Sequence, residues 1–332
     1  MSRAALSERF LRDAGWGECR RDPLPVDCSF RRYERLACDD GRGALLMDAP
    51  PPLEDVRPFV RLARHLRRLG FSAPEIMAAD EDEGFLVIED FGEGTYTRLL
   101  DAGADAAPLY AMAVDVLTAL QSRPAARDIA VPAYDAPKLL EEALLFADWY
   151  LPAAAGGPTA PSARAAFVDA WTHSLTAVSG TPDTLVLRDF HVDNLMVLRD
   201  RPGLAACGLL DFQDAVVGHP AYDLVSLLED ARRDVPAALQ DAMRQRYFGT
   251  RCDLDRTAFM AAYGVLGAQR HAKVLGIFVR KAVRDGMPTY LCHLPRLWRL
   301  LESHLHEPAL APVADWFARH VPPDRRRIPE IG

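Results

Sequence analysis

The sequence predicts an α+β fold in two lobes, a small N-terminal lobe of antiparallel strands with one main helix and a larger, mostly helical C-terminal lobe. With 332 residues, the chain is longer than most single domains. Short apolar runs separated by turn residues dominate residues 1–91, whereas apolar residues at helical spacing dominate residues 92–332. The composition, 49% hydrophobic and 26% charged, supplies an ample core for both lobes.

The smaller lobe is expected to hold two antiparallel strand pairs around one helix. Each pair is joined by a turn rich in Asp and Gly, and Gly70 ends the main helix. The expected elements, in order, are a helix at 4–14, strands at 30–36 and 44–47, a helix at 56–69, and strands at 76–79 and 85–89.

The larger lobe is expected to be helical except for one stretch, residues 187–214. There the order strand, loop, strand, turn, strand places two carboxylates and an amide at strand ends, where they are predicted to face one cleft. The expected helices lie at 109–120, 138–150, 163–179, 221–231, 237–247, 256–285 and 295–305.

Charge and cysteine content exclude several classes of protein. The formal net charge of -8 argues against a nucleic-acid-binding protein, which normally carries a basic stripe. The six cysteines form no CxxC pair, so we expect reduced thiols and neither a zinc site nor a disulfide framework. The N-terminal residues are too charged for a signal peptide, and no apolar run approaches the ~20 residues of a membrane span. We therefore expect a cytoplasmic monomer that binds no nucleic acid and no membrane.

The stretch 187–214 carries the chemistry. Asp189 and Asn194 have the D-x-x-x-x-N spacing of a kinase catalytic loop, in which the Asp is the base and the Asn a metal ligand. Asp211 follows the next strand and precedes Phe212, where phosphoryl transfer needs a second, metal-holding carboxylate. Amide and carboxylate oxygens suit Mg²⁺, a hard cation. Polar residues that merely cap turns are the bland alternative.

These motifs resemble a known family. RDFHVDN, LLDFQDAVVGHPAYDLVSLLED and the helical C-terminal half are similar to the aminoglycoside phosphotransferase family of the protein-kinase-like fold. DCSFRRYERL, LLMDAPP, VIEDFGEGTY and QRHAKVLGIFVRKAVRDG more narrowly resemble bacterial kinases that phosphorylate the anomeric hydroxyl of N-acetylmuramate and N-acetylglucosamine during cell-wall recycling. The resemblance covers the chain from Asp27 to about Leu301.

The resemblance implies ATP and Mg²⁺ as cofactors and assigns roles to individual residues. Residues 1–91 would be the nucleotide-binding lobe, and residues 92–332 the catalytic and substrate-binding lobe. Asp223 would support the catalytic loop, although an ordinary acid at a helix N-terminus is an equal alternative. The implied roles are Asp189 with Arg188 in catalysis, Asn194 and Asp211 as magnesium ligands, and the hinge Glu89, Asp90 and Phe91 as the adenine-binding segment.

The sequence also departs from the family pattern. Leu187 replaces the usual His two positions before the base, the glycine-rich phosphate loop is missing, and the strand 44–47 contains no lysine. Other residues must therefore replace the glycine-rich loop and the lysine as phosphate ligands. The candidates are Arg31 or Arg32, whose guanidinium groups bind phosphate well, and Ser29. Solvated arginines on a half-exposed strand are the alternative.

Candidates for binding the acceptor are fewer. Asp148 and Trp149 end a helix, and sugars are often held by a carboxylate and an aromatic face, but ordinary helix packing of Phe146 and Trp149 is the alternative. His191 lies inside the catalytic loop. The basic residues of the long helix are expected to form a solvated face that could instead read a sugar carboxylate; they are Arg270, His271, Lys273, Arg280, Lys281 and Arg284.

These observations predict an ATP- and Mg²⁺-dependent kinase for the anomeric hydroxyl of an N-acetylated amino sugar. One alternative is a kinase for a cationic alcohol such as an aminoglycoside or choline, which the acidic residues Glu141, Glu142 and Asp148 would suit. The other is a nucleotide-binding pseudokinase that acts as a scaffold, suggested by the missing lysine and glycine loop.

Overall fold

The computed structural model describes residues 2–25, 30–178 and 183–330. The chain divides into two compact units, Met1–Val116 with Val192–Ala215, and Leu117–His191 with Val216–Gly332. The chain thus passes from the second unit back to the first between His191 and Val192, inside the predicted catalytic loop. The division of function at residue 91 remains a prediction.

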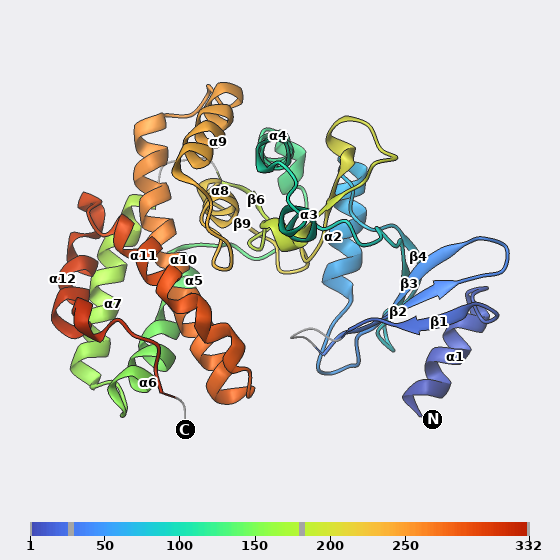
Figure 1. The fold of residues 1–332 in the computed structure, drawn as a ribbon, viewed down its shortest axis with the longest axis horizontal. Helices are drawn as coiled ribbons and strands as arrows, with labels where there is room; N and C mark the ends of the chain where they lie inside the picture. The colour runs from blue at the N-terminus through green and yellow to red at the C-terminus, as the bar shows by residue number, and fades with distance from the viewer. Residues whose placement is uncertain (1, 26–29, 179–182, 331–332) are drawn as a thin grey trace. The chain divides into compact units, whose positions relative to one another are not determined.

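The first unit is built on a five-stranded antiparallel sheet with the order β1-β2-β3-β5-β4 (Figure 1). A β-hairpin, β7–β8, returns to this unit from later in the chain. The strands are β1 (Arg20–Pro23), β2 (Arg32–Ala37), β3 (Gly43–Asp48), β4 (Ile76–Asp80), β5 (Phe85–Ile88), β7 (Leu195–Val197) and β8 (Cys207–Leu209). The helices are α1 (Arg3–Asp13), α2 (Arg57–Arg68), α3 (Tyr96–Asp101) and α4 (Ala106–Gln121), the last of which runs on into the second unit.

Helix α1 forms because its polar cap and apolar face both find partners. The Ser2 side chain accepts a hydrogen bond from the Ala5 backbone N–H, and Phe10 stacks on Phe85 of β5 with ring centroids 5.7 Å apart. Leu11 and Trp16 join the same buried cluster with residues of β2, β3 and β5. The expected helix at 4–14 is therefore confirmed.

The second unit is mostly helical and is organised around the 29-residue helix α10. A two-stranded antiparallel pair, β6 (Thr184–Val186) with β9 (Val216–Gly218), leads into the predicted catalytic loop. The helices are α5 (Ala136–Leu145), α6 (Leu151–Ala155), α7 (Pro161–Leu175), α8 (Ala221–Leu228), α9 (Ala237–Thr250), α10 (Arg256–Arg284), α11 (Leu294–His304) and α12 (Ala311–His320), with a π-helical turn at Phe146–Tyr150. Short 3₁₀ helices lie at Pro124–Arg127, Thr176–Val178, Val192–Asn194, Gly203–Ala206, Pro288–His293, Pro308–Leu310 and Pro323–Arg325.

Aromatic side chains form the core between the helices of this unit. Phe146 is fully buried and stacks on Tyr150, with ring centroids 4.8 Å apart. Its edge contacts reach Trp298 of α11 and Phe317 of α12. The alternative in which Phe146 is a packing residue is thus the one the structure supports.

A buried hydrogen-bonded cluster joins the C-terminal ends of α8 and α11 to the middle of α10. Glu229 Oε2 accepts hydrogen bonds from His271 Nε2 at 2.8 Å and from His304 Nε2 at 2.7 Å. Two ligands of a tetrahedral zinc ion would lie roughly 3.3 Å apart, because each sits about 2.0–2.1 Å from the metal. The observed spacing is that of hydrogen bonds, so the cluster links the helices.

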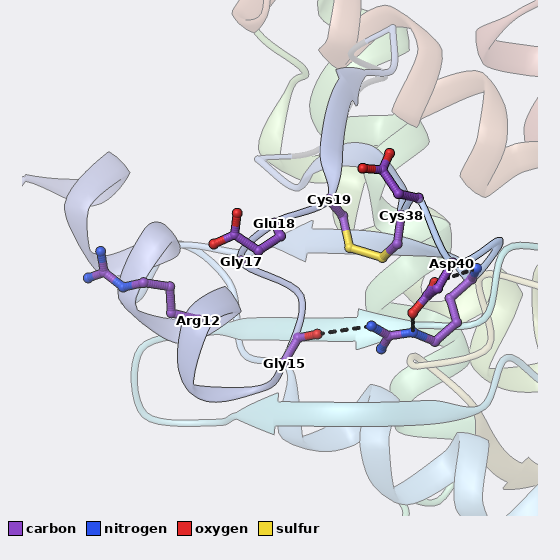
Figure 2. A pocket seen from close by; sticks show the side chains of 9 residues that line it. Arg12, Gly15, Gly17, Glu18, Cys19, Cys38 and Asp40 are labelled. Atoms are coloured by element: carbon purple, nitrogen blue, oxygen red, sulfur yellow. Dashed lines mark hydrogen bonds and ion pairs between the residues drawn. A yellow bond between two sulfur atoms is a disulfide. The ribbon is translucent and has the colours of Figure 1, made fainter.

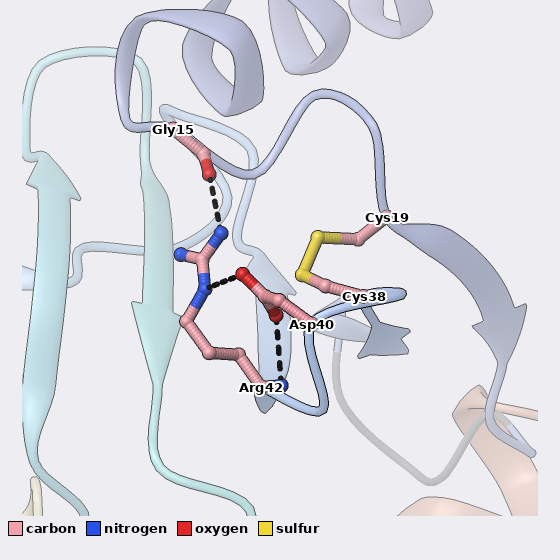
Figure 3. The surroundings of a disulfide bond; sticks show 5 residues. All are labelled: Gly15, Cys19, Cys38, Asp40 and Arg42. Atoms are coloured by element: carbon pink, nitrogen blue, oxygen red, sulfur yellow. Dashed lines mark hydrogen bonds and ion pairs between the residues drawn. A yellow bond between two sulfur atoms is a disulfide. The ribbon is translucent and has the colours of Figure 1, made fainter.

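Several strands and helices were not predicted, and the expectation that the cysteines are reduced is wrong for one pair. Strands β1 and β9 and helices α3, α6 and α12 were not expected from the sequence. The expectation of reduced thiols fails for Cys19 and Cys38, which form a disulfide with Cα atoms 4.2 Å apart (Figure 3). The reason is the register of β1 and β2, which pairs Arg20 with Ala37 and so places the next residues outward opposite each other. Cys207, Cys252 and Cys292 are free thiols.

No helix in the described ranges combines the length and the apolar character needed to cross a bilayer.

Candidate functional site

Two non-glycine residues in the described part of the chain have a left-handed backbone, Arg188 with φ 68° and Asp211 with φ 54°. Both belong to the stretch that the sequence singled out. Such conformations are uncommon for non-glycine residues and cluster at functional sites, where the surroundings hold them. The backbone therefore points to the same two positions as the motifs do.

The β7–β8 hairpin places the two predicted magnesium ligands at one end of a single element. Leu195 pairs with Leu209, and the Leu210 N–H donates to the Asn194 carbonyl at 2.9 Å. Asn194 and Asp211 therefore flank the open end of this hairpin within the first unit. Packing fixes the segment further, because Phe212 stacks on Phe59 of α2 with ring centroids 5.1 Å apart.

Arg31 reaches this end of the hairpin from the start of β2. Its Nε donates to Glu54 Oε2 at 3.1 Å, and its Nη1 lies 3.8 Å from Asp211 Oδ1. The Arg31 and Glu54 side chains are only 16% and 15% exposed, so the pair is held in place. Arg32, in contrast, is exposed. Ser29 lies outside the described residues.

The predicted hinge is anchored by ion pairs and by close packing. Glu89 accepts from Arg201 of the hairpin turn and from Arg67 of α2, and Asp90 accepts from Arg35 Nε at 2.6 Å. The Phe91 ring packs against Gly208 of β8, where an added Cβ would lie 2.9 Å from the ring. The side chains of Glu89 and Asp90 are thus engaged within the first unit, which fixes the path of the backbone.

In the second unit, Asp223 holds the start of the catalytic loop. Its Oδ2 accepts from the Leu187 N–H at 2.7 Å and its Oδ1 from the Arg188 N–H at 2.8 Å. Asp223 is fully buried at the first turn of α8. Burial raises its pKa to about 7, and the two backbone N–H groups oppose that shift. These bonds hold Arg188 in its left-handed conformation.

Asp189 stands among cationic groups of the second unit. Burial favours its neutral form, but Lys273, His191, Arg270 and Arg188 together outweigh burial and hold the pKa of Asp189 below its usual value. An ionised carboxylate can accept a proton from a hydroxyl group near neutral pH.

The predicted acceptor residues have different surroundings. His191 is buried, and burial together with nearby cations lowers its pKa, so the ring is mainly neutral at pH 7. Asp148 is exposed and accepts two hydrogen bonds from Arg164 of α7, at 2.8 and 3.0 Å. Trp149 is partly buried beside it in the π-helical turn. Their binding roles remain predictions.

The expectation of a solvated basic face on the long helix is wrong for its first half. Arg270, His271 and Lys273 are buried, at 5%, 0% and 8% exposure. The signal was present in the sequence, because apolar residues surround these cations on all sides of the helix, and a helix apolar all round is buried. A buried cation requires a partner. Lys273 pairs with Glu142 of α5 at 2.7 Å, a carboxylate that the sequence had suggested only as a possible partner for a cationic acceptor.

A pocket of about 370 Å³ lies beside the disulfide and contains none of the predicted site residues (Figure 2). Two of its charged groups pair with each other, since Arg42 Nε donates to Asp40 Oδ2 at 2.7 Å. Arg42 also lies over the Trp16 ring, 4.8 Å from its centroid. These contacts stabilise the turn between β2 and β3.

The chain is similar to known proteins over most of its length, including residues 187–214. Residues 21–262 match the model of the phosphotransferase enzyme family. A Caulobacter vibrioides protein named N-acetylmuramate/N-acetylglucosamine kinase is 38% identical and covers 98% of each chain. A Pseudomonas aeruginosa protein of the same name is 37% identical, over 95% of this chain and 93% of its own.

Solved structures agree on the fold. A choline/ethanolamine kinase family protein from Mesorhizobium loti superposes with a TM-score of 0.61 at 13% identity, covering 95% of this chain and 99% of its own. An aminoglycoside 2'-phosphotransferase in complex with GDP superposes with a TM-score of 0.59 at 16% identity, covering 92% of this chain and 98% of its own. These likenesses confirm the predicted protein-kinase-like α+β fold.

Proposed function

The chain belongs to the phosphotransferase enzyme family, and from this premise we propose that it is an ATP-dependent kinase acting on the anomeric hydroxyl of N-acetylmuramate, N-acetylglucosamine or both, in peptidoglycan recycling. Relatives with that name match nearly the whole chain. The observation that carries the chemistry is the hairpin that brings Asn194 and Asp211 to one end beside the Arg31–Glu54 pair.

The donor set at this end fits a magnesium ion. Asn194 offers an amide oxygen and Asp211 a carboxylate, and Mg²⁺ prefers oxygen ligands. The Asp211 side chain is about half exposed (48%), which leaves room for an ion and a phosphate. When bound, the ion would offset negative charge on the transferred phosphate.

Asp189 is the proposed base. It accepts the proton of the anomeric hydroxyl while the sugar oxygen attacks the γ-phosphorus of ATP, and the bond from that phosphorus to the ADP oxygen breaks. Asp223 and Arg188 position Asp189 by fixing the backbone just before it. Arg31 takes the role of the missing lysine and donates to the phosphates. Its partner Glu54 holds the guanidinium in place.

The acidic residues that could have bound a cationic acceptor already pair with basic side chains of the protein. Glu141 pairs with Lys138 at 2.9 Å, Asp148 with Arg164 at 2.8 Å, and Glu142 with Lys273 at 2.7 Å. An aminoglycoside or choline would gain little from carboxylates that already have cationic partners. This supports a neutral or anionic sugar as the acceptor.

The test is a substrate panel followed by NMR of the product. The protein is incubated with ATP and Mg²⁺ and, separately, with N-acetylmuramate, N-acetylglucosamine, choline and an aminoglycoside. The proposal expects a phosphate ester on C1 of an N-acetylated sugar. Transfer only to a cationic alcohol would refute it, and ATP binding without turnover on any acceptor would favour the scaffold alternative.

A further inference from the structure

Lys273 is a buried cation near the middle of α10, and polar and aromatic side chains surround its ammonium group. Its Nζ lies 2.7 Å from Glu142 Oε2 and 3.3 Å from the Tyr222 hydroxyl. The rings of Tyr134 and Tyr222 stand 5.9 and 5.8 Å from the ammonium group. Removing a buried charge from water is costly unless it is paired, so a lysine kept here at 8% exposure has a defined environment.

Glu142 connects this lysine to the catalytic loop. One of its carboxylate oxygens binds Lys273 and the Tyr134 hydroxyl, and the other binds the Arg188 guanidinium. Arg188 directly precedes Asp189 and has its backbone N–H bound to Asp223. Asp223 of α8 therefore holds the backbone of the loop, and Glu142 of α5 holds the Arg188 side chain. Lys273 of α10 supplies the positive charge that balances Glu142.

Charged groups from each neighbouring element act on Asp189. Helix α10 contributes Lys273 and Arg270, and the loop itself contributes Arg188 and, when its ring is protonated, His191. Helix α8 contributes Asp223, which is the one acidic group in this set and interacts with both Asp189 and Arg270. Arg270 is held by a 2.8 Å bond from its Nη2 to Ser226 Oγ. Of these cations, Lys273 favours the ionised form of Asp189 most strongly.

We propose that Lys273, held by Glu142 and Tyr222, is the positioning residue for Asp189. Its ammonium group keeps the carboxylate ionised and, through Glu142 and Arg188, fixes where that carboxylate lies. This inference rests on the proposed role of Asp189 as the base. A base in a partly buried loop would otherwise drift toward its neutral form, which cannot accept the hydroxyl proton.

The experiment compares Lys273→Met with Lys273→Arg and with a matched control, Lys281→Met. Lys281 lies on the same helix and contacts the Tyr290 ring, 5.1 Å from its centroid, so the control loses the same charge elsewhere. The first readout is a ¹³C NMR titration of the Asp189 carboxyl group, assigned with Asp189→Asn. The second is the pH profile of kcat/KM for the sugar.

The expected result is an Asp189 titration that moves up by about 1–3 pH units in Lys273→Met, since loss of an opposite charge that acts on a carboxyl typically shifts its pKa by that much. The acidic limb of kcat/KM moves with it, Lys273→Arg restores the wild-type profile, and Lys281→Met leaves the pH of both transitions unchanged. If Lys273→Met loses activity while the Asp189 titration and the acidic limb stay at the wild-type pH, the lysine is merely structural and the proposal is overturned.

A second variant guards against misfolding. Lys273→Gln removes the charge but retains an amide that can donate to Glu142, and the same upward shift is expected. A double variant adds another check, because Lys273→Met should cause little further loss in an Asp189→Asn background.

The NMR titration needs no turnover. A protein that phosphorylates no sugar in the panel would thus refute the proposed function while the titration still decides the role of Lys273.

Discussion

At the scale of single residues, the structure holds two strained positions where the proposed chemistry needs them. A non-glycine residue with a left-handed backbone costs on the order of 1–3 kcal/mol and persists only when its surroundings hold it. Asp223 and Glu142 hold Arg188 (φ 68°), and the Phe212–Phe59 stack with a 2.8 Å bond from Gln213 holds Asp211 (φ 54°). The strain places the proposed base and a proposed metal ligand rather than stabilising the fold.

Replacing Asp189 should separate catalysis from nucleotide binding. Asp189→Asn removes the proton acceptor but keeps the shape, so kcat should fall by roughly 10²- to 10⁴-fold. The thermal shift produced by ATP and Mg²⁺ should remain, because the proposed phosphate and metal contacts lie on other residues. Asp169→Asn, on the exposed face of α7, is the control and should behave as wild type. Unchanged kcat in Asp189→Asn would rule out the base assignment.

The two candidate arginines should differ in their effect on ATP. Arg31→Met removes a guanidinium held beside Asp211, and the KM for ATP should rise about 10- to 100-fold, the equivalent of one charge-assisted hydrogen bond. Arg32→Met removes an exposed side chain and should change it much less. Steady-state kinetics with ATP varied at saturating sugar distinguishes them. A larger effect from Arg32 would transfer the phosphate contact to that residue.

At the scale of elements, the close approach of α10 and α5 places Lys273 beside Glu142. Gln269 Nε2 donates to the Leu139 carbonyl at 2.8 Å, and a Cβ added at Gly276 would lie 2.2 Å from the Leu145 carbonyl carbon. The glycine is therefore needed for the contact, although glycine in a helix interior is otherwise unfavourable.

Alanine at this glycine should destabilise the protein, against the usual trend. Gly276→Ala should lower the free energy of unfolding by about 1–3 kcal/mol, because the backbone of α5 cannot give way easily. Gly249→Ala in α9, where an added Cβ meets nothing within 4 Å, should be neutral or stabilising by up to about 1 kcal/mol. Urea unfolding measures both. Equal stability of the two variants would show that α10 can move away from α5.

At the scale of the whole molecule, the sequence predicted what depends on local pattern. The α+β fold class, the main helices and the placement of Asn194 and Asp211 at strand ends follow from periodicity, spacing and resemblance, while the roles of the two residues remain predictions. The Cys19–Cys38 bond was missed because it depends on the register between β1 and β2, and β1 itself was not predicted. Lys273 was assigned to a solvated face because its partner Glu142 lies 131 positions earlier, and no periodicity links the two.

The most direct test of the central claim follows one oxygen atom. N-acetylmuramate labelled with ¹⁸O at C1 is incubated with the protein, ATP and Mg²⁺, and the product is examined by ³¹P NMR. Attack of the anomeric oxygen on phosphorus predicts a phosphate ester that retains the label as its bridging oxygen, visible as an isotope shift of the phosphorus signal. A phosphosugar without that shift, or no phosphosugar from either N-acetylmuramate or N-acetylglucosamine labelled in the same way, would contradict the account.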